Sequence, residues 1–512
     1  MPSAAIDPAI TLTSAPGKVL VVGGYLVLDR NHTGLVVGTD ACLYSTVQTR
    51  ELDLSNAART FSSTEIPVTV TSPQFESAWW KYAFDLKTNA LVQYDSADQG
   101  SNGFVQVVLQ TTLALVNTRS PGVLQSLLEQ RASSPRRAGL KILLTADNDF
   151  YSQRETLEKA GVPLTSQSLR RIPVMSKTGK TLGNVHKTGL GSSAAMVTSL
   201  VASILVHFGI VDQSDLSVDR EQRLAAPKSL QLIHNIAQYA HCLAQGKVGS
   251  GFDVSAAVYG SHVYRRFTPA VLDAAMSESS RISEVVQATS VDNCGWNSEV
   301  NPVVIPPRLT LRLADVDTGS NTPSMVKKVL QWQSANSDQA AALWAALDAA
   351  NNRIGQIWSQ LVEAHTDDRC DYDRAIDWCS KHPSFEWRSA VDTTGSPAHA
   401  LLADLVDGIG KVRQLQRELG ENAGVPIEPP KQTRLLDACM SVPGVCMAAV
   451  PGAGGYDAIF CVVLSPEAGD AVERLWSKWD EMSVGPLLAK QASSGVSVLN
   501  PALYPYLTAM LE

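Results

Sequence analysis

The clearest hydrophobic pattern in the first half of the chain follows directly on a glycine- and serine-rich stretch. Residues 194–211 are mostly apolar, contain alanines and β-branched residues, and hold no proline. Ala194, Val197, Val201 and Ile204 recur at spacings of three and four, which is the period of one helical face. The pattern predicts a largely buried helix whose N-terminus is formed by a glycine turn.

Strand-like and helix-like patterns follow one another along the rest of the chain and predict an α+β protein. After about residue 270 the composition shifts to serine-rich and then proline-rich segments, which favours two domains, residues 1–268 and 269–512. Glu428, Pro429 and Pro430 resemble a linker. The predicted strands are residues 19–22, 35–47, 68–70, 104–109, 140–144, 309–313, 445–450 and 456–464, and the predicted helices are residues 227–247, 338–364, 398–419 and 434–441.

Bulk composition narrows the classes of function. The 512 residues carry a net charge of −8 with 45% hydrophobic residues, which argues against a general nucleic-acid binder but leaves room for a local basic pocket. The eight cysteines form no C-x-x-C pair, no apolar run reaches the length of a membrane span, and no secretory signal is visible. These features predict a cytoplasmic protein with reduced thiols and no membrane insertion.

The stretch from Lys187 to Ala195 has the chemistry of a phosphate site. The first N–H groups of a helix have no partner within the helix, and glycines allow an anion to approach them closely. Ser192 and Ser193 add hydroxyls that could cap the helix or reach Mg²⁺, although a plain glycine turn with a serine cap would use the same residues. The stretch is not a Walker A loop, because Val174 stands where Gly179-Lys180-Thr181 would need a glycine.

Several charged residues border the other glycine turns. Lys18 enters the strand before Gly23 and Gly24, either as a solvated edge residue or as a cation that points into a cleft. Asp253 follows a glycine-rich stretch, where it could cap a helix or serve in a site. His234 and His241 share one helical face, but no carboxylate at ligand spacing joins them, so a packing role is favoured over a metal pair.

A second candidate anion site and a third glycine turn lie in the second half. Ser320 and Thr322 open a predicted helix with Pro323 in its first turn. Lys327 and Lys328 follow, either as phosphate ligands or as solvated helix residues. The third turn is Pro451-Gly452-Ala453-Gly454-Gly455 between two predicted strands.

The ordered set of Pro-Gly-Lys, Gly-Leu-Gly-Ser-Ser-Ala and Gly-Ala-Gly-Gly resembles the GHMP kinase superfamily over most of the chain. Residues 14–28, 187–195, 240–267 (with AQGKVGSGFDVSAAVYG) and 315–328 are similar to the phosphomevalonate kinases of fungi. The resemblance implies a two-domain α+β fold with a deep cleft, a ribosomal protein S5 domain 2-like N-terminal domain that binds ATP, and a ferredoxin-like C-terminal domain. It also implies ATP-dependent phosphorylation of (R)-5-phosphomevalonate to (R)-5-diphosphomevalonate, in the mevalonate route to isoprenoids and sterols such as ergosterol.

The resemblance also implies roles for individual residues. ATP phosphates would bind to Lys187, Thr188, Gly189, Leu190, Gly191, Ser192, Ser193 and Ala194, with Ser193 as the Mg²⁺ contact. Lys18 and Asp253 would lie at the reacting centre. The acceptor would bind to Lys18, Tyr25, Ser320, Thr322, Gly452, Ala453 and Gly454. The acceptor phosphate has a second pKa near 6 and is mostly ionised at neutral pH, so Lys18 is favoured as the electrostatic catalyst and the role of Asp253 stays open.

Two departures from the family bear on the metal and the acceptor. Gly23-Gly24-Tyr25 stands where several relatives carry Gly-Glu-His or Gly-Glu-Tyr, and His241 and Cys242 stand where some carry a glutamate that binds Mg²⁺. The expected Mg²⁺ would then be held by Ser193, ATP oxygens and water. Mevalonate kinase, diphosphomevalonate decarboxylase and a non-catalytic sensor on the same fold remain alternatives, and monomer and dimer are both compatible with the sequence.

Overall fold

The computed structural model describes residues 10–55, 57, 59–97, 100–129, 136–216, 227–277, 280–316 and 322–511. Within these residues the strands form two sheets, one of ten strands and one of four. The path through the large sheet runs β14-β1-β2-β6-β3-β4-β5, with β13 and β7 paired to β2 and with β8 paired to β7. Its strands are β1 (Ile10–Val22), β2 (Thr33–Asp53), β3 (Glu65–Thr71), β4 (Trp79–Asp85), β5 (Ala90–Ser96), β6 (Arg136–Ala146), β7 (His262–Arg265), β8 (Glu299–Pro302), β13 (Gln491–Ala492) and β14 (Ser497–Leu499).

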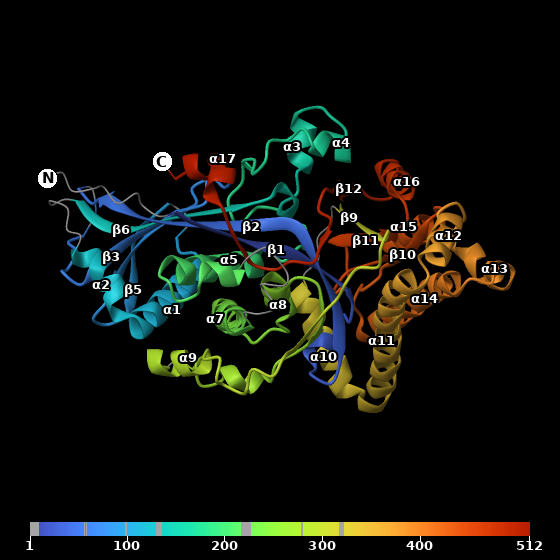
Figure 1. Cartoon of the computed structure of the whole chain (residues 1–512), viewed down its shortest axis with the longest axis horizontal. Helices are drawn as coiled ribbons and strands as arrows, with labels where there is room; N and C mark the ends of the chain where they lie inside the picture. Colours follow the sequence, from blue (N-terminus) through green and yellow to red (C-terminus); the bar gives the residue numbers. More distant parts are fainter. Residues whose placement is uncertain are drawn as a thin grey trace.

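Helices cover the large sheet in layers (Figure 1). α5 packs directly on β1 and β2, and α1 and α7 pack in turn on α5. α8 packs against β1, α5 and α7. α5 is buried almost all round, as its apolar pattern predicts, although it ends at His207 rather than at residue 211. The helices of this part are α1 (Gly103–Arg119), α2 (Pro121–Glu129), α3 (Arg154–Lys159), α4 (Ser166–Leu169), α5 (Ser192–His207), α7 (Pro227–Gln245), α8 (Phe252–Tyr259) and α9 (Ile282–Ala288).

The strand predicted at residues 104–109 is wrong, because these residues form the start of α1. Asn102 caps this helix by accepting a hydrogen bond from the N–H of Val105. Val105, Val108 and Leu109 are buried at helical spacing between neighbouring helices. Packing on those helices overrides the strand preference of the valines.

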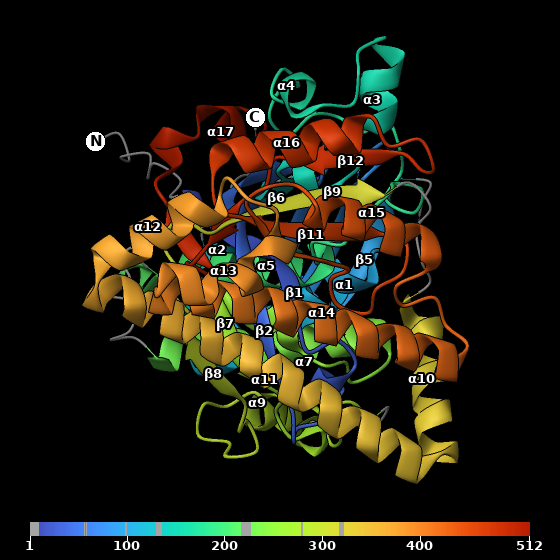
Figure 2. The same ribbon diagram turned by 90° about the vertical axis from the view of Figure 1, so that its right-hand side faces the viewer.

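The small sheet has the order β10-β11-β9-β12, is antiparallel throughout, and is covered by three helices of the second half, α14, α15 and α16 (Figure 2). α11 and α14 lie side by side, and α14 and α15 pack on β10. The strands are β9 (Thr310–Val316), β10 (Val445–Ala449), β11 (Ala458–Val463) and β12 (Val484–Leu487), and the helices are α10 (Thr322–Ala335), α11 (Ser337–Asp367), α12 (Arg369–Cys379), α13 (Trp387–Thr394), α14 (Pro397–Ala423), α15 (Pro430–Met440), α16 (Pro466–Ser477) and α17 (Pro505–Ala509).

The end of the described chain returns to the large sheet. Leu499 pairs with Leu12 on β1, and Gln491 pairs with Thr39 on β2. β8 pairs with β7 as well, so segments from both sides of residue 268 build the same sheet. The division into residues 1–268 and 269–512 stays a prediction. Over the described ranges, no helix has both the length and the apolar character needed to cross a membrane.

In the stretch predicted as a linker at residues 428–430, Glu428 and Pro429 are buried between α14 and α15, and Pro430 is exposed and begins α15. The side chain of Glu428 is fully buried and accepts hydrogen bonds from Arg413 at 2.8 and 3.0 Å and from Arg417 at 2.7 Å. The preceding carbonyl, that of Ile427, accepts a hydrogen bond of 2.8 Å from the N–H of Gly455. The ion pairs of Glu428 therefore anchor the backbone on which the third glycine turn rests.

We predict that Glu428→Gln lowers the free energy of unfolding by about 1.5–3 kcal/mol, because it removes the carboxylate that Arg413 and Arg417 share and leaves the buried Arg413 with that of Asp437. Urea unfolding followed by fluorescence measures the change. The matched control is Glu481→Gln, which removes a carboxylate bound to Arg434 at the surface and should change stability far less. Equal losses in the two variants would contradict this account of Glu428.

Candidate active site

Lys18 lies at an irregularity in β1 where the pairing with β2 shifts register between Pro16 and Lys18. A bulge of this kind redirects a side chain that would otherwise follow the pleat. The N–H of Lys18 donates to the carbonyl of Leu190 at 2.9 Å, and its ammonium donates to the carbonyl of Gly189 at 2.7 Å. Lys18 is therefore fastened by both its backbone and its side chain to residues 187–194, named the phosphate loop for their predicted role, and it is not a solvated edge residue.

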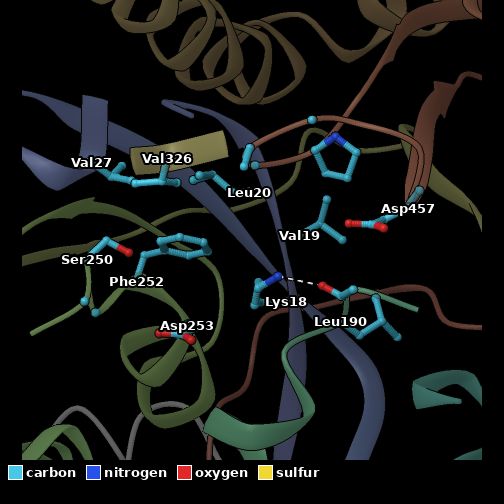
Figure 3. Close-up of a pocket in the computed structure, with 18 of the residues that line it drawn as sticks. Lys18, Val19, Leu20, Val27, Leu190, Ser250, Phe252, Asp253, Val326 and Asp457 are labelled. Carbon is cyan, nitrogen blue, oxygen red and sulfur yellow. Dashed lines mark hydrogen bonds between the residues drawn. The ribbon is translucent and has the colours of Figure 1, made fainter. Parts of the chain in front are cut away.

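The electrostatic surroundings of Lys18 are mixed (Figure 3). Its ammonium lies 5.6 Å from the centre of the Phe252 ring, and Asp253 and Asp457 lie around it. Burial lowers the pKa of Lys18 from its ordinary value of 10.5, while the charges of Asp253 and Asp457 act in the opposite direction. The two carboxylates help to keep a poorly hydrated ammonium charged.

The phosphate loop leads into α5 through two glycines in the left-handed region, Gly189 at φ 81° and Gly191 at φ 82°. Gly191 is the N-cap of α5, and a Cβ added there would lie 3.1 Å from the Cε of Lys18. Thr188 anchors the loop, because its N–H donates to the carbonyl of Phe150 at 3.2 Å and its hydroxyl donates to the carbonyl of Asp149. The loop is thus held with the first turn of α5 next to Lys18.

The two serines of the loop do not form a serine cap. Because Gly191 occupies the cap position, no side chain caps α5. The hydroxyl of Ser193 instead lies 3.0 Å from Nε2 of His241 on α7. His234, seven residues earlier, is buried and bonds Asn235 at 3.2 Å, so the two histidines do not form a metal pair.

Asp253 lies in the first turn of α8, two residues after the cap position. Gly251 is the N-cap, with φ 85°, and the carboxylate of Asp253 receives the N–H of Val254 at 3.0 Å. Its other oxygen is 4.0 Å from Nε2 of His241. Asp253 therefore belongs to the group of polar side chains around the phosphate loop.

The third glycine turn, residues 451–455, packs against the first, which contains Gly23 and Gly24. The N–H of Gly452 donates to the carbonyl of Leu20 at 3.1 Å, and the hydroxyl of Tyr25 donates to the carbonyl of Ala453 at 2.7 Å. A Cβ added to Gly24 would lie only 2.1 Å from the carbonyl oxygen of Gly452. The fit between the two turns requires glycine at residue 24.

One cavity of about 280 Å³ is bordered by Tyr25 of the first turn, by the phosphate loop and by the third turn. Of the predicted site residues, it is lined by Lys18, Tyr25, Thr188, Gly189, Leu190, Asp253, Gly452, Ala453 and Gly454. A smaller cavity of about 90 Å³ lies against the other side of the loop, where Lys187, Ser192 and Ser193 meet the rings of Phe75, Trp80, Phe104 and Tyr151. The structure therefore brings most of the predicted site residues to two cavities that share the phosphate loop.

The structure describes only part of the predicted acceptor-phosphate site. Ser320 lies outside the described residues, and the described part of Thr322 shows only that its backbone begins α10. Lys327 and Lys328 are exposed on α10, as expected for solvated helix residues, whereas Val326 of the same helix lines the large cavity.

The sequence interpretation missed several residues that line the large cavity. They are Gln238, Gln245, Lys247, Ser250, Phe252 and Asp457. Asp457 comes two residues after Gly455, and Lys247 and Phe252 belong to the glycine-rich stretch before Asp253. The position of these three residues beside glycine turns is the sequence signal that could have identified them.

Comparison with solved structures places the fold in a known class. The Lin0012 protein of Listeria innocua superposes with a TM-score of 0.59 at 14% identity over 96% of this chain and 100% of that one. A phosphomevalonate kinase of Streptococcus pneumoniae, solved with phosphomevalonate and AMPPNP, superposes with a TM-score of 0.52 at 14% identity over 94% and 99%. Residues 400–481 match the family described as GHMP kinases C terminal. The fold is thus that of the GHMP kinases, and the expected two-domain α+β GHMP fold is confirmed.

Full-length relatives identify the family within this class. The peroxisomal phosphomevalonate kinase of Arabidopsis thaliana is 38% identical over 502 residues, which cover 95% of each chain. The phosphomevalonate kinase of Aspergillus fumigatus is 34% identical over an alignment that covers 96% of each chain. This chain belongs to the phosphomevalonate kinase family.

We predict that Gly24→Ala lowers the free energy of unfolding by about 1–3 kcal/mol, the range for an overpacked contact, because the added methyl group collides with the carbonyl of Gly452. Gly410→Ala is the matched control, since Gly410 lies inside α14 with nothing within 4 Å of an added Cβ. Alanine there should be neutral or stabilising by up to about 1 kcal/mol. Denaturant midpoints that move alike in both variants would show that the turns do not pack as described.

Proposed function

We propose that this protein transfers the γ-phosphoryl group of ATP to the phosphate of (R)-5-phosphomevalonate, giving (R)-5-diphosphomevalonate and ADP in the mevalonate route to isoprenoids and sterols. The observation that carries the proposal is the meeting of three distant glycine turns around Lys18 in a chain 38% identical to a phosphomevalonate kinase over nearly its full length. The solved relative from Streptococcus pneumoniae, which holds phosphomevalonate and AMPPNP, supports the same pair of substrates.

ATP would bind along the phosphate loop. The free N–H groups at the start of α5 would receive its phosphates, with residues from Lys187 to Ala194 around them. The smaller cavity would accept the base, because its aromatic rings offer flat apolar contacts next to Ser192 and Ser193. The larger cavity, on the side of Lys18, is then left for the acceptor.

Lys18 would act as the electrostatic catalyst. Phosphoryl transfer between two anions depends on positioning and on neutralising negative charge, more than on proton removal from an already ionised phosphate. The ammonium of Lys18 is held beside Gly189 of the loop and borders the acceptor cavity, so it can face both phosphates. Asp253 would orient and keep charged this ammonium instead of acting as a strong base.

The chain offers few ligands for the Mg²⁺ that would accompany ATP. In the described portions of the chain, no group of three or more histidine, cysteine or acidic residues could hold a metal. The hydroxyl of Ser193 and the carboxylate of Asp253 both lie within 4.0 Å of Nε2 of His241, and oxygen ligands suit Mg²⁺. This small oxygen set fits an ion that keeps most of its bonds to nucleotide and water. Bound there, Mg²⁺ would supply positive charge to the ATP phosphates.

The acceptor would bind between the first and third turns. Gly452, Ala453 and Gly454 line the cavity, and the hydroxyl of Tyr25 supports them through the carbonyl of Ala453. Ser320 and Thr322 are proposed as ligands of the acceptor phosphate at the start of α10. Composition is the support for a cytoplasmic location, whereas the Arabidopsis relative is named peroxisomal.

A coupled assay of ADP release tests the function with the purified full chain. Mg-ATP is offered together with phosphomevalonate, mevalonate or diphosphomevalonate, and only phosphomevalonate should yield ADP. ADP release with mevalonate would show a mevalonate kinase, and CO₂ release from diphosphomevalonate would show a decarboxylase. Binding of phosphomevalonate without turnover would favour a metabolite sensor.

We predict that Lys18→Met lowers kcat at least about 100-fold, the scale of one lost donor to the transition state, while the fold is retained. Because burial lowers the pKa of Lys18, the wild-type rate should fall on the basic side at a pH below 10.5, as the ammonium loses its proton. Initial rates across pH measure both effects. Lys411→Met is the control, since Lys411 is exposed on α14 and its ammonium donates to the side-chain oxygen of Gln414 at 3.2 Å. Near-normal turnover of Lys18→Met would exclude the catalytic role.

A further inference from the structure

The hydrogen bond between Ser193 and His241 separates the two cavities of the site. Ser193 lines the smaller cavity, and His241 lines the larger one. His241 is only 4% exposed, and its ring rests against Phe104 with 5.5 Å between ring centres. The imidazole is thus fixed in place, and Nε2 is the ring atom that faces the loop.

Two other polar side chains lie close to the ring nitrogens of His241. The amide nitrogen of Gln245, one turn further along α7, lies 3.0 Å from Nε2 and 3.3 Å from Nδ1, and a carboxylate oxygen of Asp253 lies 4.0 Å from Nε2. The Ser193 hydroxyl lies 3.0 Å from Nε2, and because a hydroxyl can donate or accept, the imidazole holds it in either tautomer.

This hydrogen bond leaves Ser193 able to bind a cation. A serine hydroxyl has one proton and two lone pairs, and its bond to Nε2 uses either the proton or one lone pair. In both cases the Ser193 oxygen keeps a lone pair for the space beside the phosphate loop, and a lone pair suits a cation.

We propose that His241 is a positioning residue that turns the Ser193 hydroxyl so that its oxygen binds the divalent cation accompanying ATP. The inference rests on the proposed function, because it assumes that a metal-bound nucleotide occupies the loop. Residues that orient a metal ligand in this way typically change metal affinity 10–100-fold when they are replaced.

The test compares ATP binding with Mg²⁺ and with EDTA by titration calorimetry on the full chain. Mg²⁺ should strengthen ATP binding to the wild type. In His241→Phe, which keeps a ring but has no acceptor, this Mg²⁺-dependent gain should fall about 10–100-fold, while affinity for metal-free ATP changes less than about twofold. His241→Gln, whose amide oxygen can accept the serine proton, should recover part of the gain.

His234→Phe is the matched control on the same helix. His234 is buried between the rings of Tyr259 and Trp296, away from both cavities, so its replacement should leave the Mg²⁺-dependent gain unchanged. Thermal melts of each variant establish that it folds.

A double-mutant cycle with Ser193→Ala gives the decisive outcome. If His241 acts through Ser193, adding His241→Phe to Ser193→Ala should cause no further loss of the Mg²⁺-dependent gain. Additive losses, equal weakening of ATP with and without Mg²⁺, or a wild type whose ATP binding ignores Mg²⁺ would each overturn the inference. A wild type that binds Mg-ATP as expected but leaves phosphomevalonate unphosphorylated would refute the proposed function alone.

Discussion

The backbone hydrogen bond from Lys18 to Leu190 is the contact on which the site depends. It joins two segments that lie 172 positions apart in the sequence and fixes the position of the phosphate loop relative to β1. Once this bond is formed, the Lys18 side chain reaches the carbonyl of Gly189, and the missing side chain of Gly191 leaves room for its methylene groups. The loop, the first turn of α5 and the Lys18 ammonium are therefore placed by one pairing and cannot move independently.

The same arrangement addresses the main electrostatic difficulty of the reaction, which is bringing two anions together. A buried ammonium tends to lose its proton, and a neutral lysine would not help. The carboxylates of Asp253 and Asp457 oppose that loss. They also add negative charge to a site for anions, so their benefit depends on remaining close to Lys18. This explains why a catalytic role for Asp253 as a base is not needed to account for its position.

Local features of the sequence predicted the glycine turns and most elements, because positive φ angles and helical periodicity are properties of a few neighbouring residues. Phe104 to Leu109 were misjudged since alternation over six residues fits a strand as well as a helix, and only packing on α5 and α7 decides between them. The pairing of Leu499 with Leu12 could not be foreseen, since no local signal joins residues so far apart. The Ser193–His241 bond was missed for the same reason.

The third glycine turn links the buried ion pairs of the second half of the chain to the site. Gly454 has no room for a Cβ, which would lie 2.2 Å from the carbonyl of Ile427, and the same carbonyl receives the N–H of Gly455. The next residue, Glu428, is held by Arg413 and Arg417. Because the turn presses on this peptide on one side and on Gly24 on the other, a buried ion pair far from the phosphates fixes one wall of the cavity. The ion pairs of Glu428 cost free energy to desolvate, but they also fix the position of this cavity wall.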